Sequence, residues 1–264
     1  MRFRPCIDIH NGQVKQIIGG SLKDEGDRAD VNFSSARDAD YYADLYRRDG
    51  LEGGHVILLN PPSSPYYERT VQQAKMALYA FPGGLQLGGG ITAENAASYL
   101  EAGASHVIVT SYVFRDGEVD WKHMEKLRQE VGREHVVIDL SCRNRGGDYY
   151  IVTDRWQKYT NVKLSCKVLE MIAAYCDEFL VHGVDVEGHA SGIDEKLASL
   201  LKDYEGIPVT YAGGIGSLED LERFRLLTEG KLDFTVGSAL DLFGGQLPYD
   251  KINGLNWDID SARM

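Results

Sequence analysis

The chain of 264 residues is long enough for one large domain, and its hydrophobic fraction of 43% and charged fraction of 26% are those of an ordinary globular protein. Its 28 basic and 40 acidic side chains give a formal net charge of −12, which disfavours nucleic acid or an anionic membrane as a partner. The four cysteines show no CxxC spacing, and the sequence contains no signal peptide or long apolar run, so we expect free thiols, no metal site and a cytoplasmic location.

Short apolar runs alternate with helix-like segments along the whole chain. Strands are expected at Phe3–Ile9, His55–Leu59, Leu85–Leu87, His106–Thr110, His135–Leu140, Glu178–Gly183, Pro208–Ala212 and Asp233–Val236. Helices are expected at Asp38–Arg48, Glu68–Tyr79, Ala93–Ala102, Asp120–Glu130, Lys163–Tyr175, Asp194–Asp203 and Leu218–Thr228, with Thr92 and Ser217 as N-caps. This alternation predicts an α/β fold, a closed (β/α)8 TIM barrel, as a single domain over residues 1–264.

Two connections between these elements are long, at residues 19–33 and 142–161. They follow the first and the fifth expected strands, so both belong to the C-terminal face of the barrel, where active sites are built. Long loops at this face are candidate lids. The loop at 19–33 is equally well interpreted as a disordered surface excursion.

An internal repeat relates the two halves of the chain. Corresponding positions lie close to half the chain length apart: Asp8 and Asp139, Gly89–Gly90 and Gly213–Gly214, and Ser111 and Ser238, the last preceded by Gly237. Each pair falls at the end of a strand expected at the same place in its half. The repeat therefore predicts pseudo-twofold symmetry of a site at the barrel mouth.

The residue types in the repeat indicate a chemistry. A glycine pair after one strand is often only a turn, but two pairs in equivalent positions indicate phosphate groups that approach main-chain amides at helix N-termini. An aspartate after a strand is often a cap, whereas symmetric aspartates at a barrel mouth indicate catalysis. The sequence therefore predicts a substrate with two anionic ends, with Asp8 and Asp139 between the two phosphate corners.

Several motifs occur in a characteristic order: CIDIHNGQV, QLGGGI, IVTS, VIDLSCRNRGGDYYIVTDRWQKYT, VTYAGGI and FTVGSAL. From Met1 to about Leu240 the chain resembles the histidine-biosynthesis isomerase family, and FLVHGVDVEGHASGID resembles its eukaryotic-type branch. The resemblance implies an Amadori rearrangement of an aminoaldose to an aminoketose, without metal or organic cofactor. The substrate would be the bisphosphate phosphoribosyl-formimino-aminoimidazole carboxamide ribotide (ProFAR), and the product is called PRFAR. By the family's pattern Asp8 is the base and Asp139 the acid.

Further positions carry over from the resemblance. His55 would orient the substrate or Asp8, Trp156 would stack on the ligand, Arg143 would reach a phosphate together with Arg145, and Glu187 would hydrogen-bond the ligand. Each also has a structural interpretation, as a core histidine, a packed aromatic ring or solvated charges. The chain departs from the family at Thr92, where arginine is usual, at Leu59–Asn60, where strand two normally ends in aspartate, and at Gly183, where threonine usually follows the histidine.

Three alternatives share parts of this pattern. The cyclase subunit of imidazole glycerol phosphate synthase has lysine where this chain has Gln16, lacks the Trp156–Gln157 pair, and would need a glutaminase partner. A barrel that binds a phosphosugar without converting it is the second alternative, although both aspartates are retained. An enzyme that also acts on phosphoribosyl anthranilate is the third. We expect an isomerase with a small-molecule bisphosphate substrate, acting as a monomer.

Overall fold

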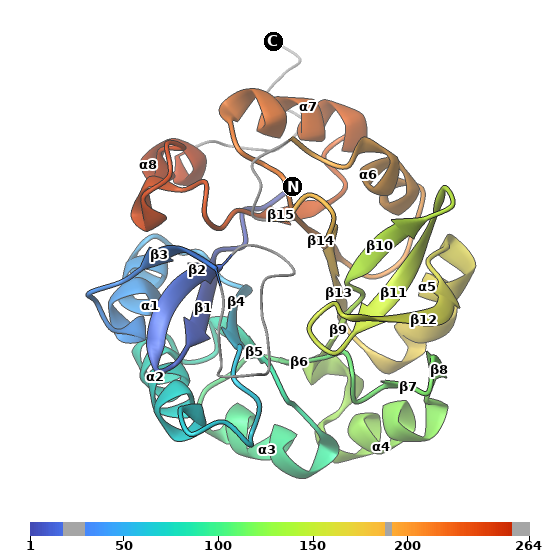
Figure 1. Cartoon of the computed structure of the whole chain (residues 1–264), viewed down its shortest axis with the longest axis horizontal. Coiled ribbons are helices and arrows are strands. Elements are labelled where there is room, and N and C mark those ends of the chain that lie inside the picture. Colours follow the sequence, from blue (N-terminus) through green and yellow to red (C-terminus); the bar gives the residue numbers. More distant parts are fainter. Residues whose placement is uncertain (18–29, 188–191, 255–264) are drawn as a thin grey trace.

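In the computed structural model, which describes residues 1–17, 30–187 and 192–254, parallel strands form a ring surrounded by helices (Figure 1). The barrel strands are β1 (Cys6–His10), β4 (Gly54–Leu58), β5 (Leu85–Gly88), β6 (Val107–Val109), β9 (Val136–Asp139), β13 (Glu178–His182), β14 (Val209–Ala212) and β15 (Asp233–Thr235). Neighbouring strands pair in parallel in this order, and a parallel bridge between Phe3 and Phe234 closes the ring. The predicted (β/α)8 barrel is confirmed.

Helices cover the outside of the ring. They are α1 (Ala39–Arg48), α2 (Tyr67–Ala80), α3 (Ala93–Glu101), α4 (Trp121–Val131), α5 (Cys166–Ile172), α6 (Glu195–Lys202), α7 (Leu218–Thr228) and α8 (Tyr249–Asn253), with short 3₁₀ helices at Arg133–His135, Ala173–Tyr175 and Asp241–Phe243. The sequence did not lead us to expect α8, a helix of only five residues, which is too short to show a helical period.

Both N-caps expected from the sequence are formed. Ser217 Oγ accepts a hydrogen bond from Asp220 N at 3.0 Å, and Thr92 N donates to Asn95 Oδ1 at 2.9 Å in a capping box. Each cap satisfies backbone groups that the first turn of a helix leaves unpaired. The caps fix the starts of α3 and α7, the two helices that follow the glycine pairs.

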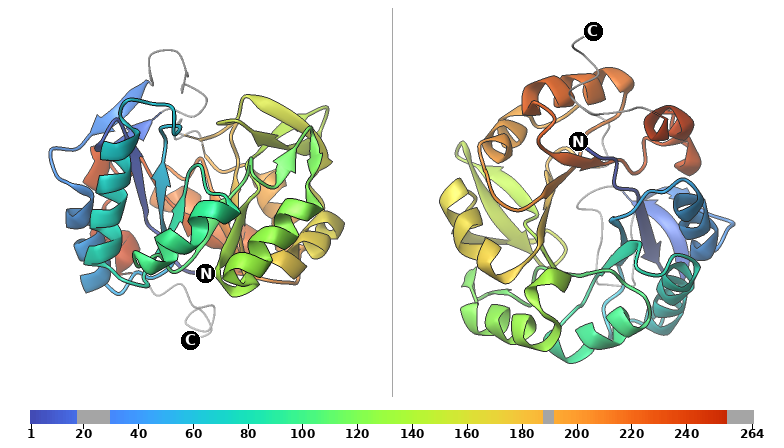
Figure 2. Two further views of the ribbon diagram at one scale, coloured as in Figure 1. Left: turned by 90° about the horizontal axis from the view of Figure 1, so that it is seen from below. Right: turned by 180° about the vertical axis from the view of Figure 1, so that it is seen from behind.

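The two long connections extend the structure beyond the barrel mouth. Strand β2 (Gln13–Ile17) pairs antiparallel with β1 and with β3 (Val31–Ser34), while residues 18–29 of the predicted loop lie outside the described ranges. The second connection is a three-stranded antiparallel sheet of β10 (Cys142–Arg145), β11 (Asp148–Thr153) and β12 (Lys158–Lys163). A small hairpin, β7 (Phe114–Arg115) with β8 (Glu118–Val119), follows β6. Figure 2 shows that the β2–β3 pair and the β10–β12 sheet rise from the same end of the barrel.

Apolar packing fills the space between strands and helices, and a smaller cluster fills the barrel itself. Inside the ring, the side chains of Ile108, Val137, Leu180 and Ala212 pack together, with Ile57 against them. These residues come from five different strands and form the floor of the space above. Such layers make the barrel a packed core rather than a pore.

Below this floor a buried polar network closes the N-terminal end of the barrel. The Glu178 carboxylate accepts hydrogen bonds from Gln86 Nε2 at 2.9 Å and from Thr210 Oγ1 at 2.6 Å, and it lies 3.7 Å from the Arg4 guanidinium. Arg4 also pairs with Asp233 at 3.0 Å. Because buried charges are tolerated only when paired and hydrogen-bonded, this network is a structural one.

No helix within the described ranges is long and apolar enough to cross a membrane. The assignment of residues 1–264 to a single domain stays a prediction, since residues 255–264 lie outside those ranges.

Candidate active site

A cavity of about 580 Å³ opens at the C-terminal ends of the barrel strands, a size usual for small-molecule sites. It is lined by every site residue expected from the sequence except Arg143 and Arg145. These are Asp8, His55, Gly89, Gly90, Ser111, Asp139, Trp156, Glu187, Gly213, Gly214, Gly237 and Ser238. Residues from both halves of the chain therefore meet in one space.

The two glycine corners have the same backbone geometry. Gly89 and Gly213 adopt φ of +100° and +123°, a region that favours glycine. A Cβ at Gly89 would lie 2.1 Å from Leu58 O, and one at Gly213 would lie 2.9 Å from Gly183 O. Each corner leads into the N-terminal end of a capped helix, α3 or α7. The geometry supports the predicted repeat, and the glycines of both corners line the cavity.

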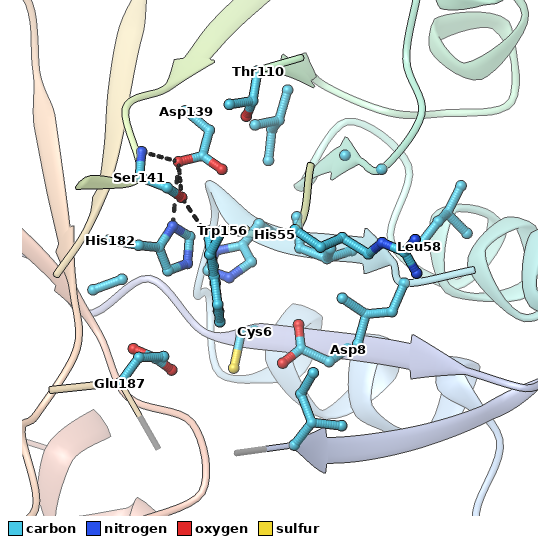
Figure 3. Close-up of a pocket in the computed structure, with 18 of the residues that line it drawn as sticks. Cys6, Asp8, His55, Leu58, Thr110, Asp139, Ser141, Trp156, His182 and Glu187 are labelled. Carbon is cyan, nitrogen blue, oxygen red and sulfur yellow. Dashed lines mark hydrogen bonds and ion pairs between the residues drawn. The ribbon is translucent and has the colours of Figure 1, made fainter. Parts of the chain in front are cut away.

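Asp139 is held by several donors at one end of the cavity (Figure 3). Its Oδ1 accepts hydrogen bonds from Ser141 N at 2.8 Å and Ser141 Oγ at 2.7 Å, and it lies 3.3 Å from His182 Nδ1. Burial opposes ionisation, but the charge of His182 and hydrogen bonds from His182, Ser141 and Thr110 outweigh it and hold the pKa of Asp139 below its usual value. This carboxylate is therefore ionised at neutral pH.

Asp8 lies across the cavity from Asp139, near Cys6 (Figure 3). Burial, followed by the nearby Glu187 carboxylate, raises the pKa of Asp8 to about 7, while the charge of His182 acts in the opposite direction. The two carboxylates thus differ in proton affinity although their positions in the two halves correspond. Such a difference is what acid–base chemistry with two carboxyl groups requires.

Two histidines line the same cavity, and their charges differ. Burial and the charge of His182 lower the pKa of His55 to about 3, with only partial compensation from Asp139, so His55 is neutral. Burial would lower the pKa of His182 as well, but Asp139, Glu187 and Asp8 raise it to about 9. The ring centroids of the two histidines are 6.2 Å apart.

Trp156 reaches into the cavity from the turn between β11 and β12. Asp154, Arg155 and Trp156 have φ of +51°, +57° and +69°, three consecutive residues in the left-handed region. The indole Nε1 donates a hydrogen bond to Ser141 Oγ at 2.9 Å, and the ring centroid lies 5.9 Å from that of His182. In Figure 3 the indole stands between the side chains of Asp139 and Asp8. The sheet thus places an aromatic face where a ligand spanning the two carboxylates would lie.

Arg143 does not reach the cavity, which corrects the expectation for this residue. Its Nε pairs with Asp185 Oδ1 at 2.8 Å, and Asp185 Oδ2 also accepts a hydrogen bond from Asn144 N at 2.8 Å. The Arg145 guanidinium lies 5.7 Å from the centroid of the Tyr159 ring. Residues 143–145 belong to strand β10, whose pairing with β11 fixes the direction of their side chains. Arg155 and Lys158 line the cavity instead.

The sequence analysis also missed three polar residues around Asp139, namely Thr110, Ser141 and His182, all of which line the cavity. His182 is the last residue of β13, and Ser141 comes two residues after the end of β9. Strand ends at this face were the signal that identified Asp8 and Asp139. Applied to the sixth strand, the same signal would have singled out His182.

Within the described parts of the chain, no group of three or more His, Cys, Asp and Glu side chains could hold a metal ion. The four cysteines are free thiols, three of them buried.

A family model and several relatives match nearly the whole chain. The family described as "histidine biosynthesis protein" matches residues 2–247. A chloroplastic relative from Medicago truncatula is 54% identical over 256 residues, which cover 96% of this chain and 80% of the relative. Relatives from Neurospora crassa and Saccharomyces cerevisiae are 46% and 41% identical, each covering 93% of this chain and 94% of the relative. All three are named 1-(5-phosphoribosyl)-5-((5-phosphoribosylamino)methylideneamino) imidazole-4-carboxamide isomerase.

Proposed function

The chain belongs to the histidine biosynthesis protein family, and we propose that its cavity isomerises ProFAR, the bisphosphate for which its relatives from Medicago truncatula and Neurospora crassa are named. The reaction is an Amadori rearrangement of an aminoaldose to an aminoketose. The observation that carries the proposal is the placement of Asp8 and Asp139 on opposite sides of one cavity, between two glycine corners of matching geometry. That arrangement suits a substrate with a phosphate at each end and a reacting sugar between them.

Binding is proposed to rest on the main chain and a few side chains. The corner of Gly89, Gly90 and Ser111 takes one phosphate, and the corner of Gly213, Gly214, Gly237 and Ser238 takes the other. Because the chain has a net charge of −12, attraction for a bisphosphate must be local. Backbone N–H groups at helix N-termini supply such attraction. Trp156, His55 and Glu187 line the space between the corners and contact the rest of the ligand.

The chemistry needs an acid and a base on opposite sides of one ribose. The acid gives a proton to the ring oxygen, the bond from C1 to that oxygen breaks, and the nitrogen lone pair forms a C=N bond. The base then removes the proton from C2 to give an enol. Protonation at C1 and loss of the hydroxyl proton at C2 complete the ketone. Proton gains and losses balance over the sequence, so no external acid or reductant is consumed.

Asp8 is the base in this proposal. A base with a pKa near the working pH combines a large ionised fraction with useful proton affinity, and the pKa of Asp8 is about 7. Asp139 belongs to the acid side of the site. The pKa of Asp139 is lowered, and its carboxylate contacts His182, so the acid side of the site consists of Asp139 and His182 together.

The cyclase alternative is less well supported. Where the cyclase has lysine, Gln16 is neutral and buried, with Nε2 3.8 Å from Cys6 Sγ. Trp156, which the cyclase lacks, occupies the cavity. A monomeric state and a cytoplasmic location stay proposals for this chain, and the Medicago truncatula relative is described as chloroplastic.

The test is turnover of ProFAR by the purified full chain, without added metal, followed by spectrophotometry with the coupling synthase present. Asp8→Asn and Asp139→Asn should each lower kcat by roughly 10³-fold, since positioned acids and bases contribute about 10²–10⁴-fold each. Affinity for the bisphosphate, measured by calorimetry, should change only severalfold because the phosphate corners are intact. The exposed Asp203→Asn serves as the matched control and should behave like wild type. Tight binding without turnover in wild type would favour a silent binder or the cyclase.

A further inference from the structure

His182 has one nitrogen bound to the protein and one directed at the cavity. Nδ1 lies 3.3 Å from Asp139 Oδ1, and this contact is the hydrogen bond that the ring makes within the described part of the chain. The side chain is 12% exposed and lines the cavity, so Nε2, the ring nitrogen that does not contact Asp139, faces the cavity. Figure 3 shows the ring beside Trp156, with its second nitrogen turned away from Asp139. Nε2 is therefore placed to donate a hydrogen bond to a ligand in the cavity.

The groups around the ring favour its charged form. Asp139 faces it from the end of β9, Asp8 from β1, and Glu187 from the segment after β13, and all three carboxyl groups raise the pKa of His182. Burial acts in the opposite direction, and His55, on β4, is neutral at working pH and adds no opposing charge. Trp156 contributes an uncharged ring. The balance leaves an imidazolium, which carries a proton on both nitrogens.

Asp139 is poorly suited to be the proton donor by itself. Its Oδ1 already accepts from Ser141 N, Ser141 Oγ and His182 Nδ1. A carboxylate with several donors resists protonation, because each donor stabilises the charged form. A carboxylate that fixes the orientation of a histidine and stabilises its charged form has the same role in the hydrolytic triad of serine, histidine and aspartate.

We propose that His182 is a further catalytic residue of this site, with its Nε2–H as the donor that protonates the ring oxygen and Asp139 as the group that holds the imidazolium in place. The inference rests on the function proposed above. In the ring-opening step the proton moves from Nε2 to the ring oxygen, the C1–oxygen bond breaks and its electron pair stays on oxygen. The nitrogen lone pair forms the C=N bond, and His182 is left neutral. The proton that C2 loses goes to Asp8, so the two steps use different groups.

The experiment compares wild type with His182→Gln, using His135→Gln as the matched control. His135 is exposed and lies outside the cavity lining. Glutamine keeps a neutral amide donor but cannot transfer a proton. We expect kcat for ProFAR to fall by about 10²-fold or more in His182→Gln, within the usual contribution of an acid, and KM to change less than threefold. Wild type should lose kcat above a pH of about 9, where His182 titrates, and His182→Gln should lack that alkaline limb.

A second measurement does not depend on the variant folding. The ¹⁵N shifts of the His182 ring in wild type report whether it is charged at pH 7.5, and Asp139→Asn should shift its titration to lower pH. A neutral ring in wild type overturns the proposal, as does a His182→Gln enzyme within fivefold of wild-type kcat or one that keeps the alkaline limb. Wild type that fails to convert ProFAR overturns the proposed function itself, so the two failures are distinguishable.

Discussion

Trp156 Nε1 lies 2.9 Å from Ser141 Oγ, and this contact joins the turn between β11 and β12 to the strand end that carries Asp139. Ser141 Oγ in turn donates a hydrogen bond to Asp139 Oδ1 at 2.7 Å. A donor that is itself hydrogen-bonded in this way is polarised and becomes a stronger donor. The indole of Trp156 is therefore linked through the Ser141 hydroxyl to Asp139, the carboxylate that contacts His182.

Trp156→Phe should lower kcat/KM for ProFAR by roughly three- to tenfold, because it removes one hydrogen bond worth about 0.5–1.5 kcal/mol and keeps most of the aromatic face. Trp121→Phe is the matched control, since Trp121 is exposed at the start of α4 and outside the cavity lining. Steady-state kinetics on the three proteins check the prediction. Equal kcat/KM for wild type and Trp156→Phe would mean that the indole N–H has no part in the site.

The barrel could be predicted from the sequence because its signals are local. Each barrel strand is a short apolar run, and the caps at Thr92 and Ser217 are visible as residue types at fixed spacing. The expected helix at Leu218–Thr228 agrees with α7 at both ends, while α5 covers only Cys166–Ile172 of the expected Lys163–Tyr175. That segment starts in β12 and ends in a 3₁₀ helix, which side-chain periodicity alone does not separate.

Part of the site could also be predicted, because the internal repeat places matching residues in the two halves of the chain. The repeat identified the glycine corners and both aspartates, because symmetric features survive as sequence patterns. Arg143 was misplaced because the direction of a side chain on β10 depends on its pairing with β11, which sequence spacing did not reveal. The charge of His182 could not be predicted, because it depends on neighbours distant in sequence, here Asp8, Asp139 and Glu187.

Gly89→Ala should be far more destabilising than Gly90→Ala. Both residues have positive φ, but a Cβ at Gly89 would lie 2.1 Å from Leu58 O, whereas one at Gly90 would meet nothing closer than Pro62 Cδ at 3.9 Å. Backbone strain alone costs about 1 kcal/mol, while a clash with main chain on a barrel strand adds more, for a total above ~3 kcal/mol. Urea denaturation of the two variants measures the difference. Equal losses would show that the corner yields easily to a side chain.

Glu187→Gln should move the pH dependence of kcat/KM toward lower pH. The Glu187 charge helps to raise the pKa of Asp8 to about 7 and that of His182 to about 9, so its removal lowers both. Asp8 acts as an ionised base, so kcat/KM falls on the acidic side as Asp8 takes up its proton. The ratio of kcat/KM at pH 6 to that at pH 8 should therefore rise in Glu187→Gln. This ratio is insensitive to a general loss of affinity, and the exposed Glu101→Gln should leave it unchanged.

Asp8→Asn should stabilise the folded protein at alkaline pH while it lowers kcat by roughly 10³-fold. The unfolded chain releases the Asp8 proton near a pKa of 3.8, whereas the folded site keeps it until about 7, because burial and then Glu187 penalise the charge. Wild type therefore loses stability as the pH rises from about 4 through 7. Each unit of pKa difference corresponds to about 1.4 kcal/mol, so a rise from 3.8 to about 7 gives a full effect at pH 8 on the order of 4 kcal/mol. Asparagine has no charge to bury, and the variant should escape this loss. Free energies of unfolding for both proteins at pH 4 and pH 8 provide the measurement. A difference between variant and wild type that is the same at both pH values would show that Asp8 carries no raised pKa, and the base proposed for the second step would lose its main support.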